Sequence, residues 1–308
     1  MTTTQKPTLE STLKSSDTEE FIDIHFYRPI GYRWALFFQK LGVTPNAVTI
    51  ASIFIGVGSG ICFYFDNLWI TLLGIFLLVW ANSYDSADGQ LARMTKQFSA
   101  LGRVLDGFAG NLWFASIYIA ICIRLYPDWG LWIWALALTT GFFHSKQAAI
   151  ADYYRNTHLL FLKGESGSEL DNTAELKETN KDQTWKNNFW EKLVAVFYTN
   201  YTKGQEDLSP NLQVLFKTLR ESFGKVSAAP QSFRDDFRQK SLPMMKWTNI
   251  LSFNTRSIAL FVSALIGLPW LYFVFELVVL NIIFIHLIRT HEKFSKEFTE
   301  AVKNGKYN

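Results

Sequence analysis

The side chains best suited to chemistry in this sequence are three carboxylates that follow a long apolar stretch. Asp85 and Asp88 lie in the run DSADGQLAR, residues 85–93, and Asp106 comes thirteen residues after Arg93. Successive residues of a helix turn by about 100°, which places Asp88 about 60° and Arg93 about 80° from Asp85. Two carboxylates and a guanidinium therefore share one face. Carboxylate oxygens are hard ligands, so this face predicts a site for Mg²⁺ or Mn²⁺ beside a phosphate chain.

Small residues lie next to these carboxylates. On the same helix, Gly89 lies about 40° from Asp85 and Ala92 nearly in line with it, which leaves a gap for a phosphate chain. Gly102 and Asp106 are one turn apart on the next predicted helix. If the two helices pack as a hairpin, Asp106 supplies a third carboxylate.

Two other interpretations of the clustered charges remain open. A solvated surface is the usual one, but apolar residues 72–80 lead directly into the cluster and residues 112–125 follow it. Charges at the edge of a membrane span are costly, and they are normally paired or functional. A purely structural salt bridge, such as one between Asp88 and Arg93, is the second alternative. The metal–phosphate site is favoured over both.

The elements that must position these residues are apolar enough to cross a membrane. Of the 308 residues, 49% are hydrophobic, and the net charge is only +3. Stretches of about 17 to 25 apolar residues have the length of a membrane-crossing helix. Such stretches begin near Val48, Leu68, Leu105, Leu131, Ile258 and Leu271. We therefore expect an all-α fold, a polytopic membrane helical bundle with six transmembrane helices, and no nucleic-acid partner.

Lysine and arginine are concentrated on one side of these spans. Most of them lie in four polar segments, residues 1–46, 93–103, 152–246 and 288–308. The short loops on the other side contain a single basic residue, Arg124. Because basic loops stay in the cytoplasm, we expect both termini, the aspartates and the large insertion on the cytoplasmic side of an inner membrane. Residues 1–20 lack the apolar core of a cleavable signal peptide.

Composition divides the chain into five parts. Residues 1–20 are polar and predict a disordered N-terminal tail. Residues 21–41 interleave aromatic and basic side chains, as an interfacial helix does, and lead into the first four spans, so that 21–151 form one part. The remaining parts are a cytoplasmic helical insertion at 152–247, two further spans at 248–290 and a cytoplasmic tail at 291–308.

The spacing of the candidate residues resembles the signature of a known family. Written as a pattern, it is D-x2-D-G-x2-A-R, eight further residues, and G-x3-D. This resembles the CDP-alcohol phosphatidyltransferases, and residues 41–49, LGVTPNAVT, are similar to the family's entry into its first helix. The resemblance implies a homodimeric membrane enzyme of phospholipid synthesis. In its reaction an alcohol attacks the β-phosphorus of a CDP-activated lipid such as CDP-diacylglycerol. The product CMP is released.

By position, the resemblance also assigns roles to the motif residues. The metal ligands, which act in catalysis, would be Asp85, Asp88 and Asp106. The CDP-substrate site would be formed by Asp85, Gly89, Ala92, Arg93 and Gly102. Within that site, Gly89 and Ala92 would leave room for the cytidine end and Arg93 would contact the diphosphate.

One position departs from the family pattern. The signature ends in another aspartate, which ligates metal and is thought to deprotonate the attacking hydroxyl, but Gly110 stands at that place. Asn111 could reach the site only through a local π-bulge, and a neutral amide is no base. Three interpretations follow: another group or a metal-bound water takes the proton, the enzyme is weakened, or the chain binds its ligand without turnover.

Two later cations are candidates for the acceptor site. Lys146 lies near the cytoplasmic end of the fourth predicted span, and Arg256 lies at the start of the fifth. Together they could hold a phosphate monoester such as inositol phosphate, which some family members use as acceptor. The alternative is that both side chains extend to lipid headgroups. For the whole chain, the alternative to an enzyme is a membrane scaffold or transporter that keeps the fold.

Overall fold

Helices form the regular structure of the described part of the chain. The computed structural model describes residues 8–10, 15–184 and 186–307, without the side chains of residues 100, 101, 103, 104, 106, 166 and 190. No strand occurs among these residues, so the predicted all-α class is confirmed for them. They fall into two compact units: Met1–Phe142 with Phe253–Leu277, and Phe143–Ser252 with Val278–Asn308. We call these the first and the second unit.

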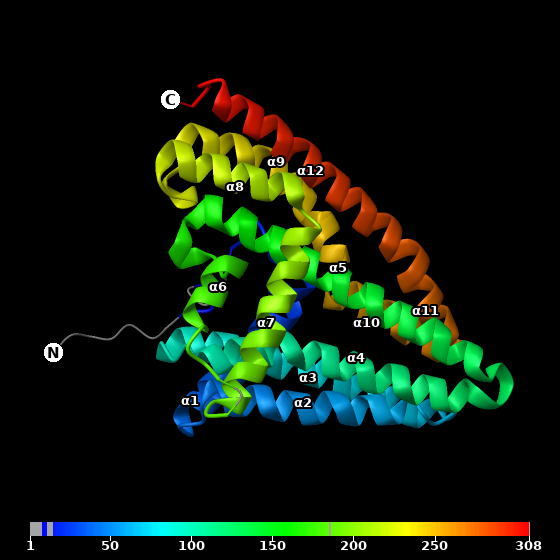
Figure 1. Cartoon of the computed structure of the whole chain (residues 1–308). Helices are drawn as coiled ribbons and strands as arrows, with labels where there is room; N and C mark the ends of the chain where they lie inside the picture. Colours follow the sequence, from blue (N-terminus) through cyan, green and yellow to red (C-terminus); the bar gives the residue numbers. More distant parts are fainter. Residues whose placement is uncertain (1–7, 11–14, 185, 308) are drawn as a thin grey trace. The chain divides into compact units, whose positions relative to one another are not determined.

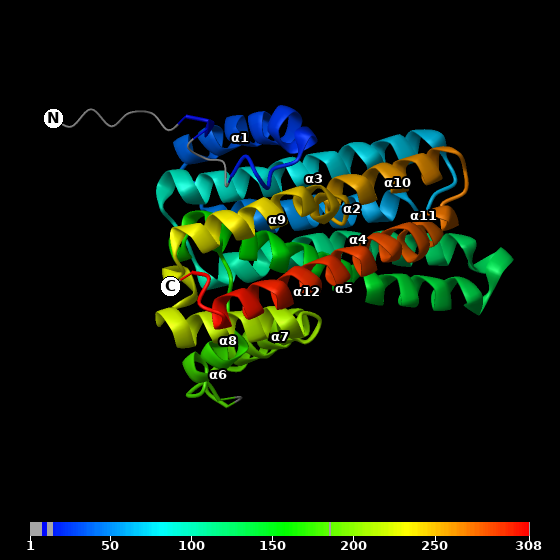
Figure 2. The ribbon, with the colours of Figure 1, turned by 90° about the horizontal axis from the view of Figure 1, so that it is seen from above.

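The first unit contains the helices that carry the aspartate motif. Its N-terminal helix is a π-helical turn, Asp23–Tyr27, continued by α1. The α-helices of this unit are α1 (Arg28–Lys40), α2 (Pro45–Cys62), α3 (Leu68–Thr95), α4 (Ala100–Trp129), the first part of α5 (Leu131–Lys163), α10 (Phe253–Leu265) and α11 (Trp270–Phe275). In both Figure 1 and Figure 2, α2, α3 and α4 run side by side.

Local sequence signals set the ends of the motif helices. The side chain of Thr44 caps α2 by accepting a hydrogen bond from the backbone of Ala47, and Pro45 occupies the first helical position, where its missing N–H costs nothing. Helix α3 ends at Thr95 and is followed by Lys96, whose φ of 56° is left-handed. Ser99 then caps α4. A short turn therefore connects the two halves of the motif.

Glycines let α2 approach α4 closely. A Cβ atom on Gly56 would overlap the ring of Trp113, and one on Gly60 would overlap the side chain of Ser116. Small residues four apart allow such close packing in membrane helices, where tight van der Waals contact drives association. The spacing Gly-x-x-x-Gly thus fixes α2 against the helix that carries the second half of the motif.

In the part of the chain that the structure describes, four helical segments are long and apolar enough to cross a membrane. They are Pro45–Cys62, Leu68–Thr95, Gly107–Trp129 and Trp270–Lys303. Their length and composition support the prediction of membrane-spanning helices, whereas the predicted number of six stays a prediction. Helix α10 contains 13 residues, which at about 1.5 Å each is shorter than a bilayer core of about 30 Å.

The second unit gathers the insertion and the C-terminal helix. Its helices are the remainder of α5, α6 (Thr173–Thr179), α7 (Phe189–Asp207), α8 (Pro210–Phe223), α9 (Gln231–Ile250) and α12 (Asn281–Lys303). Helix α12 packs against both α8 and α9 (Figure 2). An aromatic core fills this unit, formed by Phe161, Phe233, Phe237, Phe294 and Phe298. The segment predicted as a C-terminal tail thus contributes two core side chains.

Candidate active site

The first half of the motif lies on α3, beside α2. Asp88 is 4% exposed, and the hydroxyl of Thr49 on α2 donates a hydrogen bond of 2.6 Å to its Oδ2 atom. Asp85 is half-buried one turn earlier on α3. A Cβ atom on Gly89 would lie 3.6 Å from both terminal nitrogens of Arg93, so the guanidinium lies over this glycine. The structure therefore brings Gly89 and Arg93 together on one face, as the helical spacing predicts.

The second half of the motif lies on α4 and also meets α2. A Cβ atom on Gly102 would lie 2.6 Å from Oδ1 of Asn46, which accepts a hydrogen bond of 3.2 Å from the Ser99 hydroxyl. Helix α2 packs along both α3 and α4. The two halves of the motif are therefore joined through α2, and Thr49 and Asn46 are site residues that the sequence interpretation missed. Their signal was the LGVTPNAVT stretch, from which no individual role was drawn.

The remaining motif residues are placed less completely. Ala92 is half-buried on α3, and the side chain of Asp106 lies outside the described residues. Among the described residues, no three His, Cys, Asp or Glu side chains are grouped closely enough to hold a metal ion. Because Asp106 is excluded from that set, the predicted three-aspartate site stays a prediction. The described donors suit a hard divalent cation, since Asp85 and Asp88 offer only carboxylate oxygens.

Open space surrounds the position of the missing aspartate. Apart from the neighbouring backbone of α4, no heavy atom of a described residue would lie within 4 Å of a Cβ atom on Gly110. Helix α4 is a regular α-helix from Ala100 to Trp129, without the π-bulge that could bring Asn111 to the site. The Asn111 side chain is exposed, and its Nδ2 donates a 2.9 Å hydrogen bond back to the carbonyl of Gly107.

Helix α1 packs against the side of α3 that the aspartates do not use. The Gln90 side chain is fully buried and donates a 3.1 Å hydrogen bond to the carbonyl of Arg28. A Cβ atom on Gly31 would lie 2.8 Å from the Ser86 hydroxyl, so the two helices touch closely there. Ala87 and Leu91 complete this contact as fully buried residues. The motif helix is thus held from two sides, by α1 and by α2.

Arg256, one of the two candidate acceptor cations, is 1% exposed and has an acidic partner. Its Nη1 lies 2.9 Å from Oε2 of Glu276, which also accepts hydrogen bonds from Tyr118, at 2.8 Å, and from Tyr272. The sequence interpretation missed Glu276. Its signal was a single acid in the last apolar stretch, where an uncompensated charge is costly.

Lys146, the other candidate cation, belongs to the second unit. Its side chain is half-buried, and its Nζ would lie 3.3 Å from a Cβ atom on Gly204 of α7. The amine thus lies against the insertion. Arg256 belongs to the first unit, so a joint phosphate site formed by the two cations stays a prediction.

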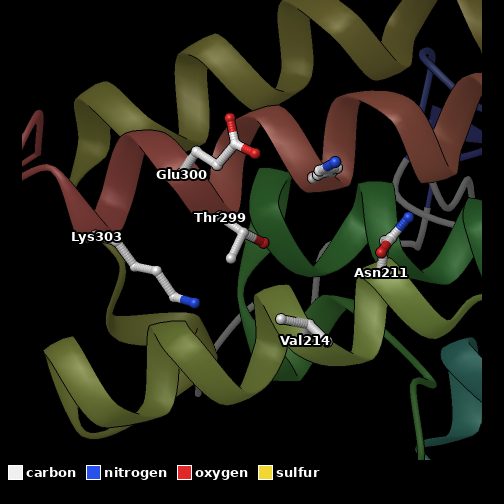
Figure 3. A pocket seen from close by; sticks show the side chains of 6 residues that line it. Asn211, Val214, Thr299, Glu300 and Lys303 are labelled. Atoms are coloured by element: carbon white, nitrogen blue, oxygen red, sulfur yellow. The ribbon is translucent and has the colours of Figure 1, made fainter.

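A separate pocket lies between α8 and α12 of the second unit (Figure 3). The side chains that line it are Asn211, Val214, Lys296, Thr299, Glu300 and Lys303. None of the predicted site residues is among them. The pocket therefore adds nothing to the candidate site on α2, α3 and α4.

Comparison with known proteins agrees with this geometry. Residues 42–155, which contain α2, α3, α4 and most of α5, match the model of the CDP-alcohol phosphatidyltransferase family. Over 90 residues the chain is 40% identical to an archaetidylinositol phosphate synthase of Pyrococcus horikoshii. This similarity covers 29% of the chain, which spans about half the length of that relative, 46%.

Proposed function

We propose that the protein transfers a phosphatidyl group from a CDP-activated lipid to an alcohol acceptor, with release of CMP. The observation that carries this proposal is the buried carboxylate of Asp88, which lies on a motif helix together with Asp85, Gly89 and Arg93 and is held by a hydrogen bond from α2. The match of this region to the transferase family supports it.

The proposed reaction exchanges one phosphorus–oxygen bond for another. The acceptor oxygen bonds to the β-phosphorus and its hydroxyl proton passes to another group of the site or to water. The bond from that phosphorus to the bridging oxygen breaks, and CMP leaves with the bonding electrons. Asp85, Asp88 and Asp106 would hold Mg²⁺ or Mn²⁺, which supplies charge neutralisation of the diphosphate. Arg93 contributes a fixed positive charge beside the glycine gap, where the diphosphate would lie.

The acceptor we propose is inositol phosphate. The named activity of the Pyrococcus relative supports this choice, as does a cation at Lys146. Arg256 supports it less, because Glu276 already neutralises its charge. A phosphate monoester needs compensating cations, so Lys146 becomes the principal candidate for the acceptor phosphate.

The membrane arrangement follows from the same proposal. We propose six spans, with one that begins near Leu131 in α5 and one that begins near Ile258 in α10 added to the four segments described above, in a homodimer of the inner membrane. Both termini, the motif and the insertion would face the cytoplasm, where the basic segments place them. CDP-activated lipid would then reach the site from the inner leaflet.

Release of CMP tests the proposal directly. Purified protein in lipid nanodiscs is supplied with CDP-diacylglycerol and Mg²⁺, and inositol phosphate is compared with serine and glycerol phosphate as acceptor. We expect CMP release that requires both the divalent ion and inositol phosphate. Release with another acceptor only would refute the acceptor assignment and keep the transferase. Binding of CDP-lipid without release under any condition would refute turnover.

A second candidate is a protein that binds CDP-lipid without transferring it. The open space at Gly110 favours this candidate, because the family places a proton-accepting carboxylate there. The two candidates differ in one measurable quantity, the rate of CMP release at saturating substrate.

A further inference from the structure

Thr49 on α2 forms a hydrogen bond with Asp88, one of the motif carboxylates on α3. Its hydroxyl lies 2.6 Å from Oδ2 of Asp88 and 3.2 Å from the carbonyl oxygen of Pro45. A hydroxyl donates only one proton, and the shorter bond to an ionised oxygen is the stronger one. Thr49 therefore donates to Asp88.

Both partners of this hydrogen bond are buried. Thr49 is 3% and Asp88 is 4% exposed, so water competes little for either group. A carboxylate oxygen has two lone pairs, and accepting one proton leaves capacity to bind a cation. The hydrogen bond restricts rotation of the carboxylate about its own axis. Such fixed orientation lowers the cost of ordering a ligand when a metal binds.

The position of Thr49 is itself fixed by its helix. Helix α2 starts at a defined point, Pro45, and is joined further along to α3 by the Ser59 hydroxyl, which donates a 2.7 Å hydrogen bond to the Gly74 carbonyl. Ser59 is a buried hydroxyl that links the same two helices as Thr49, ten residues from it. It thus serves as a matched control.

We propose that Thr49 is a positioning residue that orients the Asp88 carboxylate to bind the divalent cation of the transferase site. This inference rests on the proposed function, because it assumes that Asp88 is a metal ligand. It adds a residue of α2 to a site whose predicted ligands lie on α3 and α4.

Binding of Mn²⁺ in the presence of CDP, followed by electron paramagnetic resonance on purified full-length protein, tests the proposal. Thr49→Val keeps the shape and removes the hydroxyl, and we expect it to weaken Mn²⁺ binding about 10- to 100-fold, as loss of such supporting contacts typically does. Thr49→Ser keeps the hydroxyl and should bind Mn²⁺ nearly as the wild type does. Ser59→Ala should lower thermal stability without changing Mn²⁺ affinity.

Several results would overturn the inference. Equal Mn²⁺ affinity of Thr49→Val and the wild type would do so, as would equal losses in Thr49→Val and Ser59→Ala or in Thr49→Val and Thr49→Ser. Should the valine variant not fold, Thr49→Ala removes the same hydroxyl without adding a buried methyl group, and the same outcomes apply. A wild-type protein that binds no Mn²⁺ would overturn the metal site as well as this inference, so the two failures are distinguishable.

Discussion

Replacing Gly110 with aspartate places a carboxylate where the transferase family has its final one. The new side chain would lie one turn from Asp106 on a regular α-helix, at a spacing of about 6 Å along the axis. Beyond the backbone of α4 itself, no described heavy atom lies within 4 Å of the new Cβ position, so the described residues leave room for the substitution. Aspartate also has a slightly better helix propensity than glycine, by a few tenths of a kcal/mol. The fold should therefore tolerate the change.

The expected gain in rate is large if the native chain lacks a general base. General-base catalysis contributes about 100- to 10,000-fold, which corresponds to about 2.7 to 5.4 kcal/mol of barrier at about 1.36 kcal/mol per tenfold. The gain from helix propensity is an order of magnitude smaller. A higher rate of CMP release at unchanged protein stability would therefore show that the aspartate accelerates the reaction itself and does not act by stabilising the fold.

Initial rates of CMP release from CDP-diacylglycerol in nanodiscs measure the effect of Gly110→Asp. Gly110→Asn is the first control, because it adds a similar shape that accepts no proton. Gly107→Asp is the second, since a Cβ atom at Gly107 also meets open space among the described residues but lies about 100° around α4 from Asp106, against about 40° for Gly110. Asn111→Asp should change little, because that side chain is exposed and bonds back to its own helix.

The outcomes separate the three interpretations of the glycine. A rise of 100-fold or more, on the order expected for a base, in Gly110→Asp alone supports a weakened enzyme. An active native chain that gains nothing would refute the reasoning, because some other group must then accept the proton. Equal gains in Gly110→Asp and Gly110→Asn would also refute it. If the native chain and all variants are inert, binding without turnover is the remaining function.

Three further predictions concern packing, the buried ion pair and the acceptor. Gly56→Ala should destabilise the protein by about 1–3 kcal/mol in thermal unfolding, because the new Cβ atom overlaps Trp113. The control Gly58→Ala places its Cβ atom in open space among the described residues and should be neutral. Equal effects of the two substitutions would contradict this packing. Glu276→Gln leaves the buried charge of Arg256 uncompensated and should lower the free energy of unfolding by about 3–5 kcal/mol, measured with denaturant on the solubilised protein. An unchanged unfolding midpoint would count against the ion pair. Lys146→Gln should raise the KM for inositol phosphate and leave that for CDP-lipid unchanged; equal loss of both substrates would indicate misfolding instead.

Local features of this molecule follow directly from the sequence. The residues of one helix have fixed angular positions, so the shared face of Gly89 and Arg93 follows from spacing alone. Helix capping is equally local: a threonine followed by a proline is a typical helix start, and Thr44 caps α2 with Pro45 as its first residue. Pro210 likewise starts α8. Such features need no knowledge of which helices become neighbours.

The partners of the candidate site residues could not be predicted in the same way. Thr49 and Asp88 are 39 residues apart, and Arg256 and Glu276 lie on different helices, so each pairing depends on how helices pack. Periodicity within one helix carries no information about the register between two. An unpaired charge in an apolar stretch predicts that a partner exists, but it does not name that partner.

The contact between α1 and α3 bears on how the signature itself is understood. In the written pattern, Ser86 and Gln90 stand at positions that any residue is allowed to fill. In the folded chain both face α1, where Gln90 bonds the Arg28 backbone and Ser86 closes against Gly31. The aspartates, glycine, alanine and arginine of this stretch therefore do not by themselves account for the packing of α1 against α3. The residues that the pattern leaves unspecified therefore make the contacts that hold α3 against α1 in this chain.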